Sequence, residues 1–512
     1  MTKKKGIIFI ALLVCSFILF GCGENNHHAD SENGEARTLT VGFEGDIVSL
    51  DPHASNVTTT AQVLVQIWEP LVRVDPDTGA IIPVLAESWE RYDDYSYLFH
   101  LKQGVLFHNG LEMTADDVAF SLARAAQMPN VAAIFGDFDA ANMEAIDRYT
   151  VRIATEIPFA PLLNNIAHPA GGIISRAAYE EFGDLDAYPI GTGPFKLVDR
   201  VHGDRIVFET FEEFHGNRPR FDELVIRVMV EPNSRLIALE TGEVDLAHMS
   251  RSHIERVVES DDLVAHIASN YQKLYIGINT ERVPDIRIRQ AISYGINADE
   301  IHETIMYGVG DRLYGPLNER VFGSRQDLEG FPFDQDRARE LLAEAGYDDV
   351  NRLALTILTN EFPERGEWAL AAQSQLAQIG IDLTIVQLEA ALFLEETAAG
   401  SYDLFVLAWT SVTADADYGL FPLFHSSSIG APGNRTFFNH PRVDDLLEVG
   451  RESFDPEVRL AAYHEAQEII VYEAPMVYLA TGAKLMGAWY HIGGVRLLPD
   501  NHTLFYEIYF ID

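Results

Sequence analysis

The hydrophobic pattern is most regular between residues 334 and 408, where short apolar runs alternate with longer amphipathic segments. The apolar runs have the length and the β-branched content of buried strands, and they lie at 353–359, 381–386 and 402–408. The amphipathic segments have apolar residues at helical spacing, and they lie at 334–346, 367–378 and 390–399. Glycines at 346 and 380 stop two of these helices. This alternation predicts a βαβ lobe with a parallel sheet.

The first 250 residues have a less regular pattern of mixed strands, helices and loops. Short alternating runs predict strands at 39–44, 97–101, 151–154 and 206–209. A helix is expected after Thr114, because a threonine cap with Asp117 three residues later is a variant of the capping box. The 512-residue chain is 47% hydrophobic, which is enough for two or more packed lobes. The fold predicted is therefore a two-lobe α/β architecture.

The N-terminus has the layout of a secretory signal. Lys3, Lys4 and Lys5 precede an uncharged apolar run at 6–20, which is too short for an ordinary membrane span of about 20 residues. The run ends in Leu-Phe-Gly-Cys22, which resembles a bacterial lipobox, although Phe20 is larger than usual. We expect a signal peptide at 1–21, lipidation of Cys22 and a flexible polar tether at 22–37. An uncleaved anchor helix and an ordinary signal peptide are the alternatives.

Cysteine content and charge exclude several functions. The only cysteines are Cys15 and Cys22, so the expected mature domain has no cysteine nucleophile, cysteine-ligated zinc or iron–sulfur cluster. The formal net charge is −41, which makes nucleic acids and anionic membrane surfaces poor partners. Beyond the signal there are only four lysines, at positions 102, 196, 273 and 484. Arginine stays charged at high pH, so this composition suggests alkaline or saline surroundings, with codon bias as the alternative.

Six motifs occur in order over about 230 residues and carry a resemblance to a known family. They are SLDPH at 49–53, IWEPLV at 67–72, YLFHLKQGVLFHNG at 97–110 running into TADDV at 114–118, GTGPF at 191–195, LETGEVD at 239–245 and LYIGIN at 274–279. Together they resemble the bacterial extracellular solute-binding proteins of family 5, which serve peptide, glutathione and nickel ABC importers. Within GTGPF, glycine at unusual φ and the fixed φ of Pro194 predict a rigid bend.

The resemblance implies a periplasmic-binding-protein-like fold with a hinge and a ligand cleft between two lobes. Lobe I would comprise 38–271 and 480–512, with an inserted subdomain, and lobe II would comprise 272–479. The crossings would lie near 271–274 and 477–481. It further implies a monomeric lipoprotein on the outer face of the cell membrane that captures small peptides and docks on the importer permease. No enzyme activity, cofactor or metal is expected.

The ligand residues implied by the resemblance lie mainly in the loop after the strand at 402–408. Peptide-binding relatives pair the ligand amine with an acid and line the cleft with aromatic walls, so Trp409 is a candidate wall. Dipeptide and oligopeptide binders have an Asp three residues after this Trp, where this chain has Val412. The amine contact is therefore assigned to Asp415 or Asp417, or is absent. The alternatives are a buried core tryptophan and two solvated loop carboxylates.

Arginine is the expected partner of the ligand carboxylate. Arg365 follows the strand at 353–359 near a helix start, where a guanidinium and a helix N-terminus both favour an anion. Arg435 is the second candidate, and an exposed surface arginine is the alternative for Arg365. From the first lobe, residues 56–60 after the Asp-Pro-His turn, among them Asn56 and Thr58, are expected to line the cleft.

Three other functions compete with peptide capture. An enzyme would need a catalytic motif, and the chain has no Gly-x-Ser-x-Gly, His-Glu-x-x-His, phosphate-loop or dinucleotide pattern. Uptake of a nickel chelate or another small solute on the same fold is the main alternative, although the histidines at 425, 440, 464 and 491 are scattered. A signalling receptor or an adhesive surface protein is the third.

Overall fold

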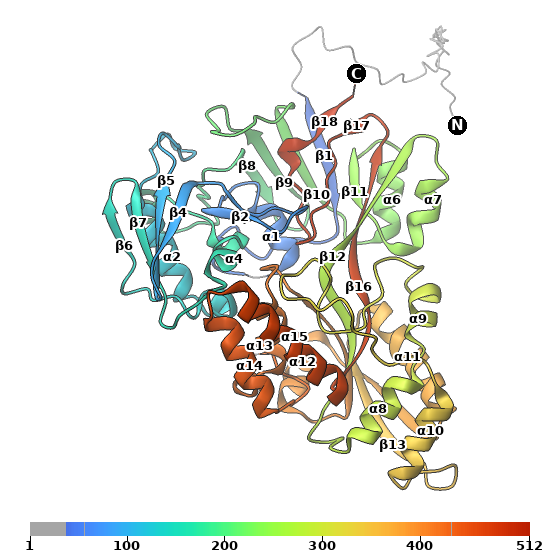
Figure 1. The fold of residues 1–512 in the computed structure, drawn as a ribbon. Helices are drawn as coiled ribbons and strands as arrows, with labels where there is room; N and C mark the ends of the chain where they lie inside the picture. Colours follow the sequence, from blue (N-terminus) through green and yellow to red (C-terminus); the bar gives the residue numbers. More distant parts are fainter. Residues whose placement is uncertain (1–36, 56, 432, 512) are drawn as a thin grey trace, which may run out of the picture. The chain divides into compact units, whose positions relative to one another are not determined.

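The protein is described by a computed structural model that covers residues 37–55, 57–431 and 433–511 (Figure 1). The region from Arg37 onward forms one compact unit. The predicted signal at 1–21, the lipidation of Cys22, nearly all of the predicted tether and the candidate Asn56 lie outside the described residues. Within the described residues, no helix is both long and apolar enough to cross a membrane.

A mixed sheet of ten strands runs through the unit, in the order β14-β13-β15-β12-β16-β11-β1-β10-β9-β8. Two long antiparallel strands, β12 (Leu263–Ile278) and β16 (Met476–Trp489), lie side by side in its middle (Figure 1). The strands on one side are β1 (Thr38–Phe43), β8 (Phe195–Val201), β9 (Arg205–Thr210), β10 (Glu223–Val228) and β11 (Leu246–His248). Those on the other side are β13 (Leu353–Thr359), β14 (Ile381–Gln387) and β15 (Leu404–Thr410). We call these sides, each with the helices and loops that accompany it, the first half and the second half.

The second half confirms the predicted βαβ arrangement. Strand β13 pairs in parallel with both β14 and β15, so the three strands end at the same edge. Helices cover both faces (Figure 1). One face carries α8 (Ile286–Gly295), α9 (Ala298–Thr304), α10 (Gln335–Glu344) and α11 (Pro363–Ala377). The other carries α12 (Ala390–Ala399), α13 (Ala416–Phe424), α14 (Pro441–Glu452) and α15 (Pro456–Glu473).

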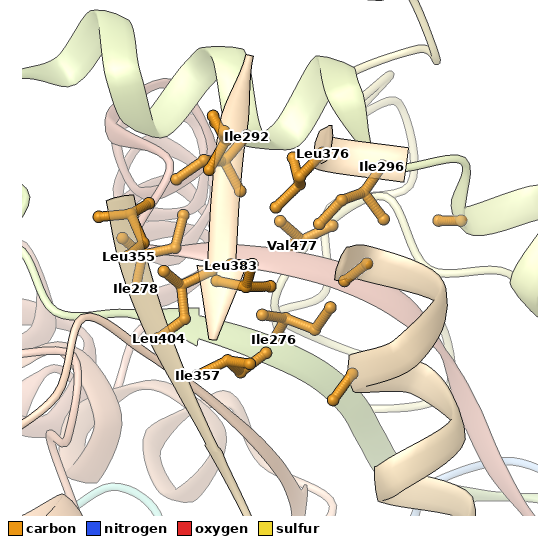
Figure 2. Close-up of a cluster of buried hydrophobic side chains, with 14 of the residues drawn as sticks. Ile276, Ile278, Ile292, Ile296, Leu355, Ile357, Leu376, Leu383, Leu404 and Val477 are labelled. Carbon is orange, nitrogen blue, oxygen red and sulfur yellow. The ribbon is translucent and has the colours of Figure 1, made fainter. Parts of the chain in front are cut away.

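Figure 2 shows the apolar layer between the sheet and helices α8 to α11. Strand alternation places Ile276 and Ile278 of β12 on this face, in the same buried cluster as Ile292 of α8 and Leu376 of α11. Tyr275 points to the opposite face, among α12 to α15. The two faces of the same strand thus supply two separate cores.

Several predicted boundaries in this half differ from the structure by one to four residues. Helix α11 begins at Pro363, before the predicted start at 367, because proline is well suited to the first helical turn. Strand β15 runs from Leu404 to Thr410, so it starts and ends slightly later than predicted. Helix α10 is capped by Asp334, whose carboxylate accepts a hydrogen bond from the Arg337 amide at 2.9 Å.

The first half is covered on one face by α6 (Pro232–Glu240) and α7 (Ile254–Val258). A separate four-stranded sheet packs against α2 (Ala115–Ala126) and consists of β4 (Ala86–Asp93), β5 (Ser96–Leu101), β6 (Glu144–Asp147) and β7 (Thr150–Ala154). The remaining elements are α1 (Thr58–Leu64), α3 (Ala132–Phe135), α4 (Leu162–Ile166), α5 (Arg176–Phe182), β2 (Val72–Val74), β3 (Ile81–Pro83), β17 (Ile492–Gly493) and β18 (Tyr509–Phe510). The strands predicted in this part all form.

Of two local predictions in the first half, one is confirmed and one is wrong. The capping box of α2 is confirmed, because the Thr114 amide and hydroxyl both donate to the Asp117 carboxylate at 2.9 Å. The reason predicted for the glycines of GTGPF is wrong, since neither Gly191 nor Gly193 has positive φ. A Cβ on these residues would lie 2.1 and 2.6 Å from the Ile67 carbonyl oxygen. These glycines allow a close approach of two backbones, which periodicity does not reveal.

Candidate functional site

The pairing of β12 with β16 is interrupted near the middle of the sheet. Residues up to Ser269 pair with β16 in one register, and pairing resumes at Lys273 in another. Between them, the Tyr271 amide donates to the Pro499 carbonyl at 2.8 Å, and the Asn270 amide side chain donates to Asn501 at 2.6 Å. The C-terminal segment therefore occupies the gap where the first half of the sheet meets the second.

A small cavity of about 20 Å³ lies at this junction. Both halves of the structure contribute to its walls. The first half supplies Arg73, Val74 and Pro76 (β2 and the turn after it) and Ala167 and Pro169 (after α4). The other lining residues are Tyr271 of β12, Val412 and Ala414 after β15, and Leu498, Pro499 and Asp500 of the C-terminal segment. A cavity of this size holds about one water molecule. Any larger ligand therefore requires the two halves to separate.

The loop after β15 has the place that was predicted for it, at the end of a strand and next to the cavity. Trp409 is half-buried, and its indole donates a hydrogen bond to the Tyr418 carbonyl at 2.9 Å. The two rings lie 5.3 Å apart between centroids. Trp409 packs against the core of the β4–β7 sheet as well as the core under α12 to α15. It therefore connects the two halves, while Val412 lines the cavity.

Asp415 is sealed inside the second half. Its side chain is 1% exposed, and both carboxylate oxygens accept hydrogen bonds from Arg459 Nη2, at 2.8 and 2.9 Å. Asp415 also caps α13 by accepting from the Asp417 amide at 2.9 Å. Burial raises the pKa of Asp415, against the opposing charge of Arg459. The carboxylate predicted as an amine contact already has a cationic partner.

Asp417 is engaged in the same way. Its oxygens accept hydrogen bonds from Arg451 Nε and Nη2 at 2.9 and 3.1 Å, and its side chain is 5% exposed. Arg451 Nη1 also lies 3.3 Å from Asp137 Oδ2, on the loop between α3 and β6. Burial raises the pKa of Asp137, and the Arg451 charge opposes this rise. Arg451 thus joins one acid from each half of the structure.

Further contacts join the two halves. The Asn164 amide side chain donates to the Thr413 carbonyl at 2.9 Å, and the Ala160 amide donates to the Arg451 carbonyl at 2.9 Å. Elsewhere, Arg251 after β11 donates to Glu364 of α11 at 2.5 Å. These polar contacts hold the two halves together in the described conformation.

The predicted arginines lie near one buried hydroxyl of the second half. Arg365 is half-buried over the Phe362 ring, and it has no ion-pair partner among the described residues. Arg435 donates to the Leu394 carbonyl at 2.6 Å and to the Thr397 hydroxyl at 2.7 Å. Burial lowers the pKa of both guanidinium groups. Burial also raises the pKa of Tyr275, and both arginine charges oppose that rise.

Tyr275 is fully buried, and its hydroxyl has no hydrogen-bond partner among the described residues. Unpaired buried hydroxyls are uncommon, because the missing hydrogen bond costs about 1–3 kcal/mol. The structure therefore brings Arg365 and Arg435 within electrostatic range of an unused hydrogen-bond donor. Of the residues predicted for the first lobe at 56–60, Thr58 begins α1, and none of the described residues 57–60 lines the cavity.

Sequence reasoning missed three polar residues of the cavity wall, namely Arg73, Tyr271 and Asp500. The Asp500 carboxylate is 27% exposed and lies 3.0 Å from His502 Nδ1. Burial alone would raise its pKa, but His502 and Lys484 outweigh this effect and lower the pKa to about 2. The Pro499-Asp500-Asn501 run has the composition of an ordinary turn, so no local signal pointed to a site.

Lys484 lies behind this segment and is buried. Its ammonium donates to Gln62 Oε1 at 2.8 Å and to the Asn501 carbonyl at 2.6 Å. Burial lowers its pKa to about 7, with Asp500 and Glu44 opposing the change. No group of three or more potential metal ligands occurs among the residues that the structure describes.

Comparison with known proteins identifies the family. Residues 80–431 match the family model described as "Bacterial extracellular solute-binding proteins, family 5 Middle". A glutathione-binding protein, GsiB of Pectobacterium atrosepticum, is 30% identical over 484 residues, which cover 92% of this chain and 93% of the relative. The chain belongs to family 5 of the extracellular solute-binding proteins. The resemblance predicted from the six motifs is confirmed.

Solved structures of similar proteins agree with this family 5 assignment. The DppA protein of Helicobacter pylori, in complex with the peptide STSA, is 26% identical with a TM-score of 0.79 and covers 93% of this chain and 98% of its own. NikZ of Campylobacter jejuni, in complex with Ni(L-His), is 22% identical with a TM-score of 0.80 and covers 92% of this chain and 99% of its own. Family 5 proteins of this kind have the two-lobe α/β fold, so the predicted fold class is confirmed.

Proposed function

We propose that this family 5 protein captures a short peptide between its two lobes and delivers it to an ABC importer without transforming it. The observation that carries the proposal is the cavity at the junction of the two sheet halves, which has charges of both signs and the Tyr271 ring in its wall. A peptide with free termini has one charge of each sign and a backbone that aromatic walls can shield from water. The relatives named for glutathione and for a bound peptide support the same ligand class.

The lobes in this proposal are those predicted from the sequence, with lobe I at 38–271 and 480–512 and lobe II at 272–479. Support comes from the change of register between Ser269 and Lys273, because a break in pairing is a natural place for two packed bodies to turn. The C-terminal segment at 499–501 contacts this break. Ligand entry would separate the contacts of Arg451 with Asp137 and of Asn164 with Thr413.

Arg365 is our choice for the ligand carboxylate, and Arg435, which also acts on Tyr275, is the second candidate. Arg365 makes a cation–π contact and no ion pair with a described residue, so its charge is available. The unpaired Tyr275 hydroxyl adds a hydrogen-bond donor to the same region. An anion would satisfy both groups.

Asp415 and Asp417 have an indirect part in this proposal. Their ion pairs with Arg459 and Arg451 hold the loop that connects Trp409 to α13. Trp409 would then form a wall of the opened cleft, since it already packs against residues of both halves. Lipidation at Cys22 would tether the protein to the outer face of the cell membrane, where it works as a monomer and docks on the permease.

Titration calorimetry with a defined ligand panel tests the function. The panel contains dialanine, trialanine, reduced glutathione and nickel–histidine, each added to the domain purified without refolding. We expect saturable binding of at least one peptide at one molecule per chain, and no heat from nickel–histidine. Binding of nickel–histidine alone would establish the metal-chelate alternative. Hydrolysis of a peptide during the titration, followed by mass spectrometry, would show an enzyme.

A further inference from the structure

The cavity at the junction has one carboxylate in its wall. Among the described residues that line it, Arg73 and Asp500 are the charged ones. They form no ion pair with each other: Arg73 has no acidic partner among the described residues, and Asp500 contacts His502. A small zwitterionic molecule that enters here when the two halves separate would meet one charge of each sign.

The acids expected to bind the ligand amine are unsuitable for that role. Asp415 and Asp417 are 1% and 5% exposed, and each has an arginine nitrogen close by, at 2.8 and 2.9 Å. A ligand ammonium at either one would have to enter a packed core and compete with a guanidinium for the same lone pairs. Val412, which lies on the loop and lines the cavity, is apolar. The loop after β15 therefore presents no free carboxylate to the cavity.

Asp500 differs from both in its surroundings. Its side chain is 27% exposed and lines the cavity, and its close side-chain partner is His502, whose Nδ1 lies 3.0 Å away. The Lys484 ammonium donates to Gln62 and to the Asn501 carbonyl, so its hydrogen bonds are directed to other acceptors. Each carboxylate oxygen has two lone pairs, and the contacts from His502 leave some of them unused. Asp500 can therefore accept a further N–H donor.

We propose that Asp500, and neither of the two loop acids, receives the free ammonium group of the bound peptide. The proposal rests on the proposed function, because it requires a peptide in the cavity. The C-terminal segment thus supplies the residue that selects for a free amine. Arg73 supplies the opposite charge in the same wall, so the wall stays electrically balanced when no ligand is bound. Ligands whose amine is blocked are disfavoured.

The effect has an expected size. A hydrogen bond between an ammonium and a carboxylate in a shielded cleft changes affinity by about 10- to 100-fold. Wild-type protein should therefore bind a free-amine peptide at least about 10-fold more tightly than the N-acetyl form. The affinity of D500N for the free-amine peptide should fall by a similar factor. Its affinity for the N-acetyl peptide should equal that of the wild type. The readout is the preference for a free amine, which is the ratio of the affinities for the free-amine and the N-acetyl peptide.

The experiment uses trialanine and N-acetyl-trialanine, or glutathione and N-acetyl-glutathione if glutathione binds more tightly in the panel. Calorimetry compares the wild type, D500N, D417N and the control D261N, which removes an exposed acid before β12. We expect D500N to lose the preference and both D417N and D261N to retain it. A D500N variant that keeps the wild-type preference overturns the proposal, as does a D417N variant that alone loses it.

Two further variants keep the test decisive. The double variant V412D/D500N places a carboxylate elsewhere on the same cavity wall and should restore part of the preference. If D500N fails to fold, D500S removes the carboxylate with another small polar side chain, and an unchanged preference in D500S would contradict the proposal. If the wild type binds the peptide but tolerates acetylation, this inference fails while the proposed function stands. If the wild type binds no peptide of the panel, both fail.

Discussion

Two groups of charged side chains lie close to the junction of the sheet halves, and they differ in how far they are exposed to solvent. Asp415 and Asp417, after β15, are sealed and paired with Arg459 and Arg451. Asp500 lines the cavity and remains partly exposed. Sealed pairs hold a loop in place, because removing one partner leaves a buried charge. Partly exposed charges at a cavity can exchange water for a ligand, so they are the ones that can recognise it.

The largest expected effect comes from breaking a sealed pair. In D415A, Arg459 stays buried without its counter-charge, which should lower the free energy of unfolding by about 3–5 kcal/mol. Urea unfolding followed by tryptophan fluorescence measures the change. The double variant D415A/R459M removes both charges and should recover much of the loss. A D415A variant within about 1 kcal/mol of the wild type would show that the pair is not structural.

The second prediction concerns Lys484, a sealed charge without an acidic partner in contact. Its pKa in the folded protein is about 7, below the value of about 10.4 for an unfolded chain. Between these values the unfolded chain binds more protons, so stability rises with pH by up to about 1.4 kcal/mol per pH unit. This contribution should be absent from K484M. Unfolding at pH 7 to 10 measures the difference between the two proteins, with K102M at a partly exposed lysine as the control.

A smaller effect is expected at Arg365, where the charge is available for ligand. Replacing Arg365 with alanine should weaken peptide binding about 10-fold, or about 1.4 kcal/mol, and change stability much less. Amidation of the peptide carboxylate should lower the affinity of the wild type for the peptide by a similar factor. The affinity of R365A should not change on amidation. The control R352A removes an arginine paired with Asp382 just before β13. Equal affinities of R365A and the wild type would remove Arg365 from the site.

The smallest effect is expected for an exposed pair. Arg339 and Asp336 of α10 lie 2.7 Å apart, but their side chains are 45% and 94% exposed. Water screens such pairs, so R339A should change the free energy of unfolding by less than about 0.5 kcal/mol. The same urea experiment measures it. A loss comparable to that of D415A would mean that exposure does not separate the two kinds of charge.

The regular parts of the fold could be predicted because their signals are local. The cap and acid of α2 lie three residues apart, and the β13–α11–β14–α12–β15 series has a repeating pattern that identifies each element. The start of α11 was missed because the helix extends through polar residues that precede its first apolar positions. The close approach of Gly191 to Ile67 was missed because it joins segments that are far apart in the sequence.

The candidate site was harder to predict for the same reason. The loop that was predicted to follow a strand does follow β15, and its residues Val412 and Ala414 line the cavity. The partners of Asp415 and Asp417 lie 44 and 34 residues away, so the sequence alone could not show that both acids are paired. Asp500 comes from a segment that returns to the junction near the C-terminus, and nothing in its local sequence distinguishes it from an acid in a turn.

The distribution of lysines has a practical consequence. Lys273 and Lys484 are buried in β12 and β16, whereas Lys102 and Lys196 are partly exposed on the side of the first half. Succinimidyl esters react with accessible amines, so of these four side chains only Lys102 and Lys196 offer attachment points, and both lie on the side of the first half. A sensor chip coupled through these residues would hold that half and leave the other free to swing. Surface plasmon resonance on such a chip would then record ligand-driven closure with a uniform orientation.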